Sequence, residues 1–351
     1  MALKYYLPYF HWGSKFNAGY KAREDVEEIL KRMTLSEIDV FKKKENRRIF
    51  SPFKLLSLLA ESMKNKQLKH STVVFQNGTG LDLIIAPVLE KSFRMGRRIV
   101  IVHDIESIRH GRFFDKVREK IVFTQFTDAI CNTKEMCNYL RENLGFRGNT
   151  YTFGFWIYLL KYVDPEKINV IPEKEYGRYR IVIAGNLSKL KAGYLYKIST
   201  KLSPKNYVMK LYGKGFTGKT VPNVVEFVGA FHPDELPYKL EGHFGLVWDG
   251  EEVETIANTT GDYLRYNSPH KASLYIVSGL PLIVWKESAI YELVKQYNIG
   301  FGVSNLMELD EKLSQVTEDE YRTWKKNIVA LAETLATGKN LEELLRKILD
   351  V

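Results

Sequence analysis

The chain has 351 residues, of which 45% are hydrophobic and 27% are charged. This balance fits folded domains with apolar cores and excludes a mainly disordered or low-complexity chain, and the length predicts two domains. The net charge is +10, and the whole excess lies in residues 1–170, which indicates an anionic partner for the first half: a membrane surface, a nucleic acid or a phosphorylated ligand. The first residues lack the layout of a signal peptide, and the two cysteines form neither a disulfide framework nor a metal site, so we expect a cytoplasmic protein.

Short apolar segments typical of strands alternate with helical patterns, which predicts an α/β fold with mostly parallel sheets. In the first half the predicted strands are Lys4–Phe10, Glu37–Phe41, Thr72–Gln76, Arg98–His103 and Asp128–Cys131. The predicted helices there are Ala22–Met33, Pro52–Lys64, Leu81–Arg94 and Lys134–Asn143. The polar segment Tyr162–Tyr176 carries two prolines and is the predicted linker.

The second half repeats this alternation. Its predicted strands are Arg180–Ala184, Tyr207–Tyr212, Val224–Val228, Phe244–Trp248, Pro281–Trp285 and Gly300–Val303. Its predicted helices are Ala192–Thr200, Pro269–Ser278, Ser288–Tyr297, Asp319–Ala336 and Leu341–Leu349. We therefore expect two Rossmann-like domains, residues 1–165 and 175–330, facing a central cleft, and a helical segment over 331–351. Ligands of such sheets bind at the carboxyl ends of the strands.

One stretch matches the P-loop pattern, in which a glycine-rich turn leads from a strand into a helix whose N-terminus holds phosphates. Gly213–Thr220 has the required spacing of glycine, lysine and threonine. The residues after it, Val224–Val228, predict another strand, so no helix N-terminus is available. We interpret the stretch as a glycine-rich loop.

Two other segments carry groups suited to a diphosphate. Gly185–Lys189 directly follows a predicted strand, and its candidate ligands are Gly185, Asn186, Ser188 and Lys189. The second segment opens a predicted helix, with Ser268 as N-cap, Pro269 at the first helical position, and then His270 and Lys271. A phosphate there would meet unpaired N–H groups and an ammonium group. The alternative is an ordinary turn and an ordinary capped helix.

Metal chemistry has little support in this sequence. There is no Asp-x-Asp pair, the nearest match being Asp249-Gly250-Glu251, and the histidines lack the spacing of zinc ligands. We therefore expect no metal and no cofactor. Asp249 ends a predicted strand, and we expect it to bind a hydroxyl group of a donor sugar.

His103, Asp104 and Glu106 follow the apolar strand Ile99–Val102, where α/β enzymes often place acid–base residues. The alternative is an Asp that caps a helix beside a surface Glu. The aromatic and polar loop His11–Gly19 suits contact with a sugar, or is a plain connection.

The basic cluster Phe41–Phe50 contains Lys42, Lys43, Lys44, Arg47 and Arg48 and precedes the amphipathic stretch Pro52–Leu59. Such a cluster suits an anionic membrane surface. The alternative is a solvated loop before a core helix.

Several segments together resemble bacterial β-1,6-galactofuranosyltransferases of surface-polysaccharide synthesis. They are Phe16–Asp25, Ile101–Arg109, Ala184–Lys189, Gly245–Gly250 and Gly261–Tyr275. A looser similarity reaches the glucosyltransferases that extend glycans on streptococcal adhesins. At Ile256-Ala257-Asn258 the sequence departs from the Cys-Ser-Gly-like stretch of the first family, in a loop that bears on the donor sugar.

The resemblance implies a GT-B fold, a UDP-sugar donor, no essential metal and a glycan acceptor that is often lipid-linked. By the same likeness, Lys189, Tyr212 and Lys271 hold the nucleotide diphosphate. Asn17, Lys21, Arg23 and Arg109 lie in two of the family-like segments, and we expect them to bind the acceptor.

These features predict an inverting glycosyltransferase that moves galactofuranose from its UDP donor to a glycan hydroxyl. We expect Asp104 to be the base, with His103 orienting it and Glu106 in reserve. The alternatives are a UDP-glucose-dependent enzyme acting on a protein-linked glycan and a catalytically silent subunit that binds sugar nucleotides. Nucleic-acid binding ranks last, because the aromatic residues form no recognisable RNA-binding module. We expect the protein at the inner face of the cell membrane, and a homo-oligomer is compatible with the sequence.

Overall fold

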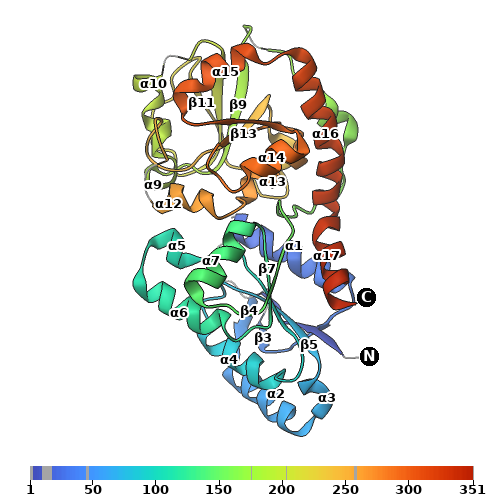
Figure 1. Cartoon of the computed structure of the whole chain (residues 1–351). Coiled ribbons are helices and arrows are strands. Elements are labelled where there is room, and N and C mark those ends of the chain that lie inside the picture. The colour runs from blue at the N-terminus through green and yellow to red at the C-terminus, as the bar shows by residue number, and fades with distance from the viewer. Residues whose placement is uncertain are drawn as a thin grey trace. The chain divides into compact units, whose positions relative to one another are not determined.

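The computed structural model describes residues 3–9, 18–44, 47–174, 176–202, 204–256 and 259–350. The chain divides into two compact units. Unit 1 comprises Met1–Lys15, Arg23–Phe153 and Leu341–Val351, and unit 2 comprises Phe16–Ala22 and Gly154–Asn340. The expected linker 162–176 therefore falls inside unit 2, and the expected helical segment 331–351 is divided between the units after Asn340 (Figure 1).

Unit 1 contains a parallel six-stranded sheet in the order β2-β1-β5-β6-β7-β8. The strands are β1 (Lys4–Tyr6), β2 (Ser36–Glu37), β5 (Thr72–Gln76), β6 (Arg98–Ile101), β7 (Asp128–Cys131) and β8 (Asn149–Thr152). Its helices are α1 (Ala18–Arg32), α2 (Pro52–Lys64), α3 (Lys66–Lys69), α4 (Asp82–Ser92), α5 (Glu106–His110), α6 (Phe113–Phe123), α7 (Lys134–Leu144) and α17 (Lys339–Leu349). The unit boundaries fall inside α1 and α17.

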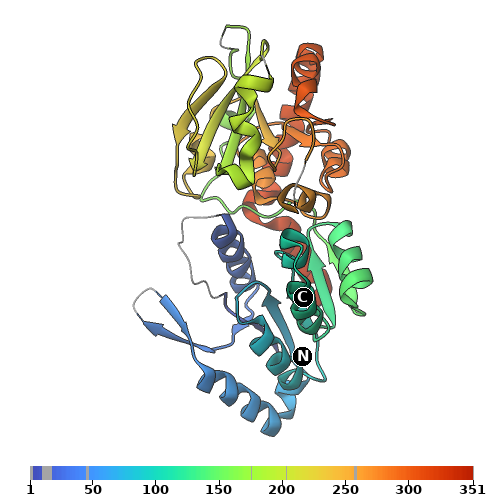
Figure 2. The same cartoon turned by 90° about the vertical axis from the view of Figure 1, so that its left-hand side faces the viewer.

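The expected strand Glu37–Phe41 is wrong. The backbone N–H of Val40 donates to the carbonyl of Ile38, at 3.0 Å, so the chain turns there instead of extending. After this turn β3 (Phe41–Lys44) pairs with β4 (Arg47–Phe50) as an antiparallel hairpin, which stands off from the sheet in Figure 2. The side chains of the five basic residues named above lie outside the described ones, so their role at a membrane stays a prediction.

Unit 2 contains a second parallel six-stranded sheet, in the order β11-β10-β9-β12-β13-β14. The strands are β9 (Tyr179–Asn186), β10 (Tyr207–Lys214), β11 (Val225–Gly229), β12 (Phe244–Val247), β13 (Leu282–Trp285) and β14 (Gly300–Val303). Its helices are α8 (Pro165–Asn169), α9 (Lys189–Ala192), α10 (Ile198–Lys201), α11 (Leu236–Lys239), α12 (Thr259–Asp262), α13 (His270–Val277), α14 (Tyr291–Tyr297), α15 (Leu309–Gln315) and α16 (Glu318–Thr337).

The expected helix Ala192–Thr200 is instead two short helices, α9 and α10, joined by a 3₁₀ turn. The interruption has a tertiary cause. Ala192 forms a parallel bridge with Gly250, and the Gly250 N–H donates to the carbonyl of Lys191 at 3.0 Å. A continuous helix would use these backbone groups itself, so the pairing ends α9 and draws Lys191 toward the end of β12.

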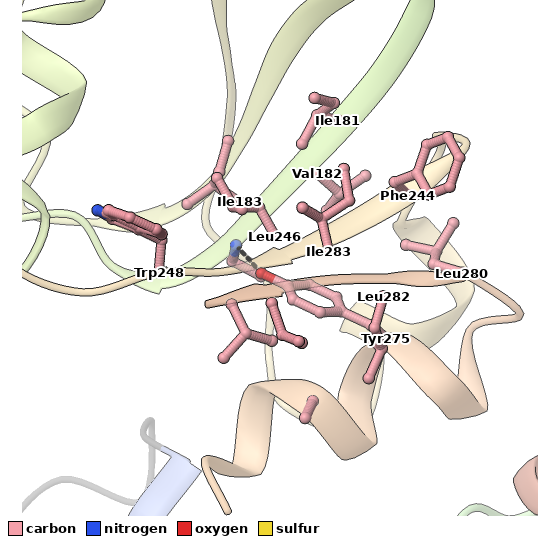
Figure 3. Packing of buried hydrophobic residues seen from close by; sticks show 14 of the residues in the cluster. Ile181, Val182, Ile183, Phe244, Leu246, Trp248, Tyr275, Leu280, Leu282 and Ile283 are labelled. Carbon is pink, nitrogen blue, oxygen red and sulfur yellow. Dashed lines mark hydrogen bonds between the residues drawn. The ribbon is translucent and has the colours of Figure 1, made fainter. Parts of the chain in front are cut away.

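The core of unit 2 forms where α13 packs against the centre of the sheet (Figure 3). Tyr275 of α13 is fully buried, and its hydroxyl accepts a hydrogen bond from the Ala184 N–H of β9 at 2.7 Å. Gly245 of β12 makes this contact possible, because a Cβ there would lie 2.2 Å from the Tyr275 ring. The same packing fixes where α13 begins, which matters for the site below.

None of the helices in the described ranges combines the length and the apolar character that crossing a lipid bilayer requires.

Candidate active site

In unit 2 the strand order reverses beside β9. The chain runs from β9 outward through β10 and β11, and later fills the other side with β12, β13 and β14. The carboxyl ends of β9 and β12 therefore flank the point at which ligands of open parallel sheets bind.

A buried carboxylate and two ammonium groups meet at this point. Asp249, just after β12, is 2% exposed. One of its oxygens accepts from Lys191 Nζ at 2.5 Å and the other from Lys271 Nζ at 2.7 Å. Lys271 also donates to the carbonyl of Trp248 at 3.0 Å. The lysine–aspartate cluster, Lys191, Asp249 and Lys271, thus joins the ends of two strands and the start of α13.

The electrostatics of the cluster favour its charged form. Burial opposes ionisation of Asp249, but the two lysines hold the pKa of its carboxyl below the ordinary value. Burial lowers the pKa of Lys271, and Asp249 partly offsets that shift. The arrangement preorganises one excess positive charge at the switch point.

The start of α13 carries polar atoms without a partner. Asn267 Oδ1, Ser268 Oγ and His270 Nε2 are buried and make no hydrogen bond with the residues that the structure describes. Ser268 was expected to cap the helix, but the N-cap is Pro269, whose extended backbone places Ser268 one residue further out. Unpaired buried polar atoms beside a helix N-terminus suit a bound anion or hydroxyl group.

His270 is neutral in this setting. Its ring stacks on Tyr158 at 4.7 Å between centroids. Burial, helped by the nearby Lys21 ammonium, lowers its pKa to about 3 despite a backbone hydrogen bond at Ile157. The helix N-terminus therefore keeps a hydrogen-bonding group that does not add charge at neutral pH.

The end of β9 and the turn after it leave open space at Gly185. Gly185 has φ +120°, and a Cβ there would meet no other atom within 4 Å. Asn186 Oδ1 accepts from the Ser188 N–H at 3.0 Å, which closes a turn before α9. Lys189 lies over the ring of Tyr196, at 5.4 Å, so Lys191 rather than Lys189 reaches Asp249.

Tyr212 and the loop after it make contacts within unit 2, and the role of Tyr212 at the donor stays a prediction. Tyr212 is 1% exposed, and its hydroxyl accepts from the Glu241 N–H at 3.2 Å. Gly213 and Lys214 end β10, residues 215–220 form a loop, and the next element is strand β11 and not a helix, as the interpretation of this stretch predicts. The Thr217 N–H donates to the Tyr196 hydroxyl at 2.9 Å, which anchors this loop.

In unit 1 the strand order reverses between β1 and β5. Gln76 ends β5 and lies beside His103, which follows β6. The Gln76 Nε2 donates to the carbonyl of Arg23 at 3.3 Å, so its Oε1 faces His103 Nε2 at 2.7 Å. With Gln76 in this orientation, His103 Nε2 is the donor of the hydrogen bond between the two side chains.

Asn77 fixes the backbone of the predicted catalytic residues. Its Oδ1 accepts from the His103 N–H and its Nδ2 donates to the carbonyl of Asp104, both at 2.7 Å. The Asp104 carboxylate accepts from Arg109 at 2.7 Å and is 24% exposed. His103 and Asp104 are thus held together at the carboxyl edge of the sheet, as the sequence predicts, with Arg109 beside them.

Glu106 is the first residue of α5, and its carboxylate pairs with Arg118 at 2.6 Å. Glu119, which sequence analysis missed, caps this helix from α6. Its two oxygens accept from the N–H groups of Glu106 and Ser107 at 2.5 and 3.2 Å. Burial raises the pKa of Glu119 to about 7, although these hydrogen bonds and Arg118 oppose the shift.

The residues predicted to bind the acceptor are divided between the two units. Arg23 lies at the unit 1 site, with its guanidinium over the Tyr9 ring at 5.0 Å and against Gly78. Lys21 belongs to unit 2, where its ammonium donates to the Leu159 carbonyl at 2.9 Å and pairs with Asp234 at 3.1 Å. Asn17 lies outside the described residues.

Residues 11–17 and Ala257-Asn258 also lie outside the described ranges. Among the residues that the structure describes, no three or more His, Cys, Asp or Glu side chains group as metal ligands. Independence from a metal stays a prediction.

Each unit of the chain matches a known protein-family model. The N-terminal domain model of glucosyltransferase 3-like proteins matches residues 4–145, and the C-terminal domain model matches residues 181–348. The chain is 28% identical to "Beta-1,6-galactofuranosyltransferase WbbI" of Escherichia coli over 72% of each protein. It is 29% identical to "Glucosyltransferase 3" of Streptococcus gordonii over 32% of this chain and 34% of that one.

Solved structures agree on the fold. HepE of Anabaena superposes with a TM-score of 0.60 at 14% identity and full coverage of both chains. Sucrose-phosphate synthase of Thermosynechococcus elongatus superposes with a TM-score of 0.62 at 12% identity, over 99% of this chain and 98% of that one. The two matched domain models and the shared architecture confirm the predicted family and fold: the chain belongs to the glucosyltransferase 3-like proteins and is a glycosyltransferase of the GT-B fold.

Proposed function

We propose that this enzyme transfers galactofuranose from UDP-galactofuranose to a hydroxyl group of a glycan acceptor in cell-surface polysaccharide synthesis, with inversion at the anomeric carbon. The geometric observation that carries the proposal is the start of α13 in unit 2. Three buried polar atoms without partners lie there, next to the lysine–aspartate cluster. We assign the donor sugar from the name of the E. coli relative, which is that of a galactofuranosyltransferase.

Unit 2 would hold the donor. The diphosphate is anionic, and charge-assisted hydrogen bonds from Lys191 and Lys271 and from the N–H groups of α13 would stabilise it as a leaving group. Asp249 holds both ammonium groups in place before the donor arrives. Structures of HepE, which shares the fold, were solved with UDP and with UDP-glucose.

Unit 1 would supply the acceptor site and the base. Asp104 takes the proton from the acceptor hydroxyl while that oxygen forms its bond to the anomeric carbon and the bond to the UDP oxygen breaks. Arg109 and the Asn77 contact hold Asp104 in place. His103, held by Gln76 and Asn77, would contact a sugar hydroxyl beside Asp104.

UDP-glucose with a protein-linked glycan acceptor is the second candidate, because the family model and the streptococcal relatives bear the name glucosyltransferase 3. A donor screen separates the two. UDP release is measured with UDP-galactofuranose, UDP-galactopyranose and UDP-glucose, each against the same glycan acceptors.

Acceptor-dependent release with UDP-galactofuranose alone supports the proposal, and release with UDP-glucose alone replaces it with the second candidate. The Lys271→Ala and Asp104→Asn variants serve as controls that link any release to the two sites.

A further inference from the structure

An exposed apolar face lies on α6 of unit 1. Phe113 is 74% exposed and Phe114 is 84% exposed, and Val117 and Ile121 are 42% and 47% exposed. Positions 113, 117 and 121 are four residues apart, so they lie along one side of the helix, with Phe114 at its start. The other side of α6 is used for packing, since Val122 and Phe123 are buried.

A second group of exposed apolar residues lies on α4, which packs beside α6. Leu83 and Ile84, in the first turn of α4, are 44% and 52% exposed. We call these six residues, Leu83, Ile84, Phe113, Phe114, Val117 and Ile121, the α4–α6 apolar face. Since α4 follows β5 and Asp104 follows β6, the first turn of α4 begins at the same carboxyl edge of the sheet as Asp104.

Exposed cations lie on the same two helices or beside them in the chain. Arg112, directly before Phe113, and Lys120, beside Ile121, are exposed, as are Lys91 and Arg94 at the end of α4. The acidic residues of α6 do not offset them. Asp115 is largely covered and pairs with Arg118, and Glu119 is buried under α5. An apolar surface bordered by cations complements a surface of anionic lipids.

We propose that the α4–α6 apolar face docks unit 1 onto an anionic lipid bilayer. A second copy of the chain fits less well, because a two-fold interface would bring this face onto itself and oppose cations to cations. The inference rests on the proposed function in one respect: it identifies the glycan acceptor as lipid-linked, presented at the bilayer next to Asp104.

Vesicle flotation of the full chain tests the surface. We expect binding to vesicles that contain phosphatidylglycerol and much weaker binding to phosphatidylcholine alone. The double variant Phe113→Ser/Phe114→Ser should bind at least about tenfold more weakly, because it removes the two most exposed rings. The matched control Tyr176→Ser/Met307→Ser removes exposed apolar side chains of unit 2 and should bind as the unmodified chain does.

High salt separates this face from the basic β3–β4 hairpin. Vesicle binding through cations alone should vanish in high salt. If the phenylalanines insert into the bilayer, part of the vesicle binding should persist in high salt, and the double variant should lack this part. Equal binding of the double variant and the unmodified chain overturns the proposal. Concentration-dependent dimerisation that the double variant abolishes, without vesicle binding, also overturns it and makes a second copy the occupant.

Activity measurements keep this inference distinct from the proposed function. With a water-soluble acceptor the double variant should release UDP at the unmodified rate, and with a lipid-linked acceptor in vesicles it should be slower. If no donor in the screen is turned over while flotation behaves as expected, the reaction assignment fails and the docking surface stands. If the rate falls equally with both acceptors, the surface acts on the enzyme itself, which overturns the docking role.

Discussion

In unit 2 two ammonium groups share one buried carboxylate, whereas in unit 1 Asp104 and Glu106 pair with arginines that are partly open to solvent. Exposed ion pairs of the second kind contribute about 0–1 kcal/mol to stability, while removing one partner of a buried pair costs about 3–5 kcal/mol. The difference shows which interactions hold the side chains of each site in place. The donor-side geometry is held by its charges, and the unit 1 geometry is held by the amides of Gln76 and Asn77 and by the backbone.

The largest effect is expected from the unit 1 carboxylate. Asp104→Asn should lower kcat by about 10²–10⁴, because the base is lost while Arg109 keeps a partner. UDP affinity, measured by calorimetry, should stay near that of the unmodified enzyme, since unit 2 is unchanged.

Asp249→Asn is the contrasting variant. It leaves two lysines without their shared counter-ion, so it should lower both the free energy of unfolding and UDP affinity. If Asp104→Asn retains most of its turnover while a folded Asp249→Asn loses it, Asp104 is not the base and the assignment of the base must be withdrawn.

The next effect concerns the two lysines of the cluster. Lys191→Ala and Lys271→Ala should each weaken UDP binding by at least about tenfold, because each removes a charge-assisted contact worth roughly 1.5–3 kcal/mol. Lys189→Ala is the matched control on the same helix, since its ammonium lies over Tyr196 and not at Asp249. Calorimetry that finds UDP binding impaired in the Lys189 and Lys271 variants but unchanged in the Lys191 variant would restore the pair predicted from the sequence, Lys189 and Lys271.

A smaller effect follows from the buried carboxylate that caps α5. Because the pKa of Glu119 is raised to about 7, the carboxylate that accepts both N–H groups forms only as pH rises through 7. Loss of this cap at lower pH should disturb Arg109 on α5, so we expect kcat to rise through a step near pH 7. Glu119→Gln should remove the step, and Asp115→Asn on the same helix should retain it.

The free energy of unfolding should fall with rising pH over the range in which kcat is expected to rise. A carboxyl whose pKa is raised on folding, from 4.5 to about 7, makes the native state bind more protons than the unfolded state. The free energy of unfolding therefore falls as pH rises from 4.5 to 7, and Glu119→Gln should flatten this slope. Urea unfolding on either side of pH 7 measures it, and an unchanged slope in the variant would contradict the assignment.

The smallest effect is expected at the P-loop-like stretch. Lys219→Ala should leave UDP affinity and turnover near their unmodified values, because strand β11 follows and no helix N-terminus completes the loop. ATP hydrolysis by the unmodified chain that this variant abolishes would show that the loop binds phosphate after all.

Local sequence was enough for the elements whose signals are local. Pro52–Lys64, Thr72–Gln76 and Asp128–Cys131 have the bounds that their apolar patterns predict. The start of α13 was predicted to within one residue, because Pro269 marks it. The loop after β10 was predicted because a strand pattern follows that loop. The short polar strand β8 and the short helix α5 were missed because a few residues carry too little periodic pattern.

The sequence by itself determined the α/β class, the resemblance to a glycosyltransferase family, and the strand ends at which polar residues gather. Only the tertiary structure decided which of those residues meet. Lys191 reaches Asp249 because β9 and β12 are neighbours in the sheet and the Ala192–Gly250 bridge breaks the expected helix. Glu119 caps α5 from another helix. The polar side-chain atoms of Asn267 and Ser268 lack hydrogen-bond partners because tertiary packing shields them from water. Side-chain pairing and burial depend on neighbours distant in the chain, which a periodic pattern does not record.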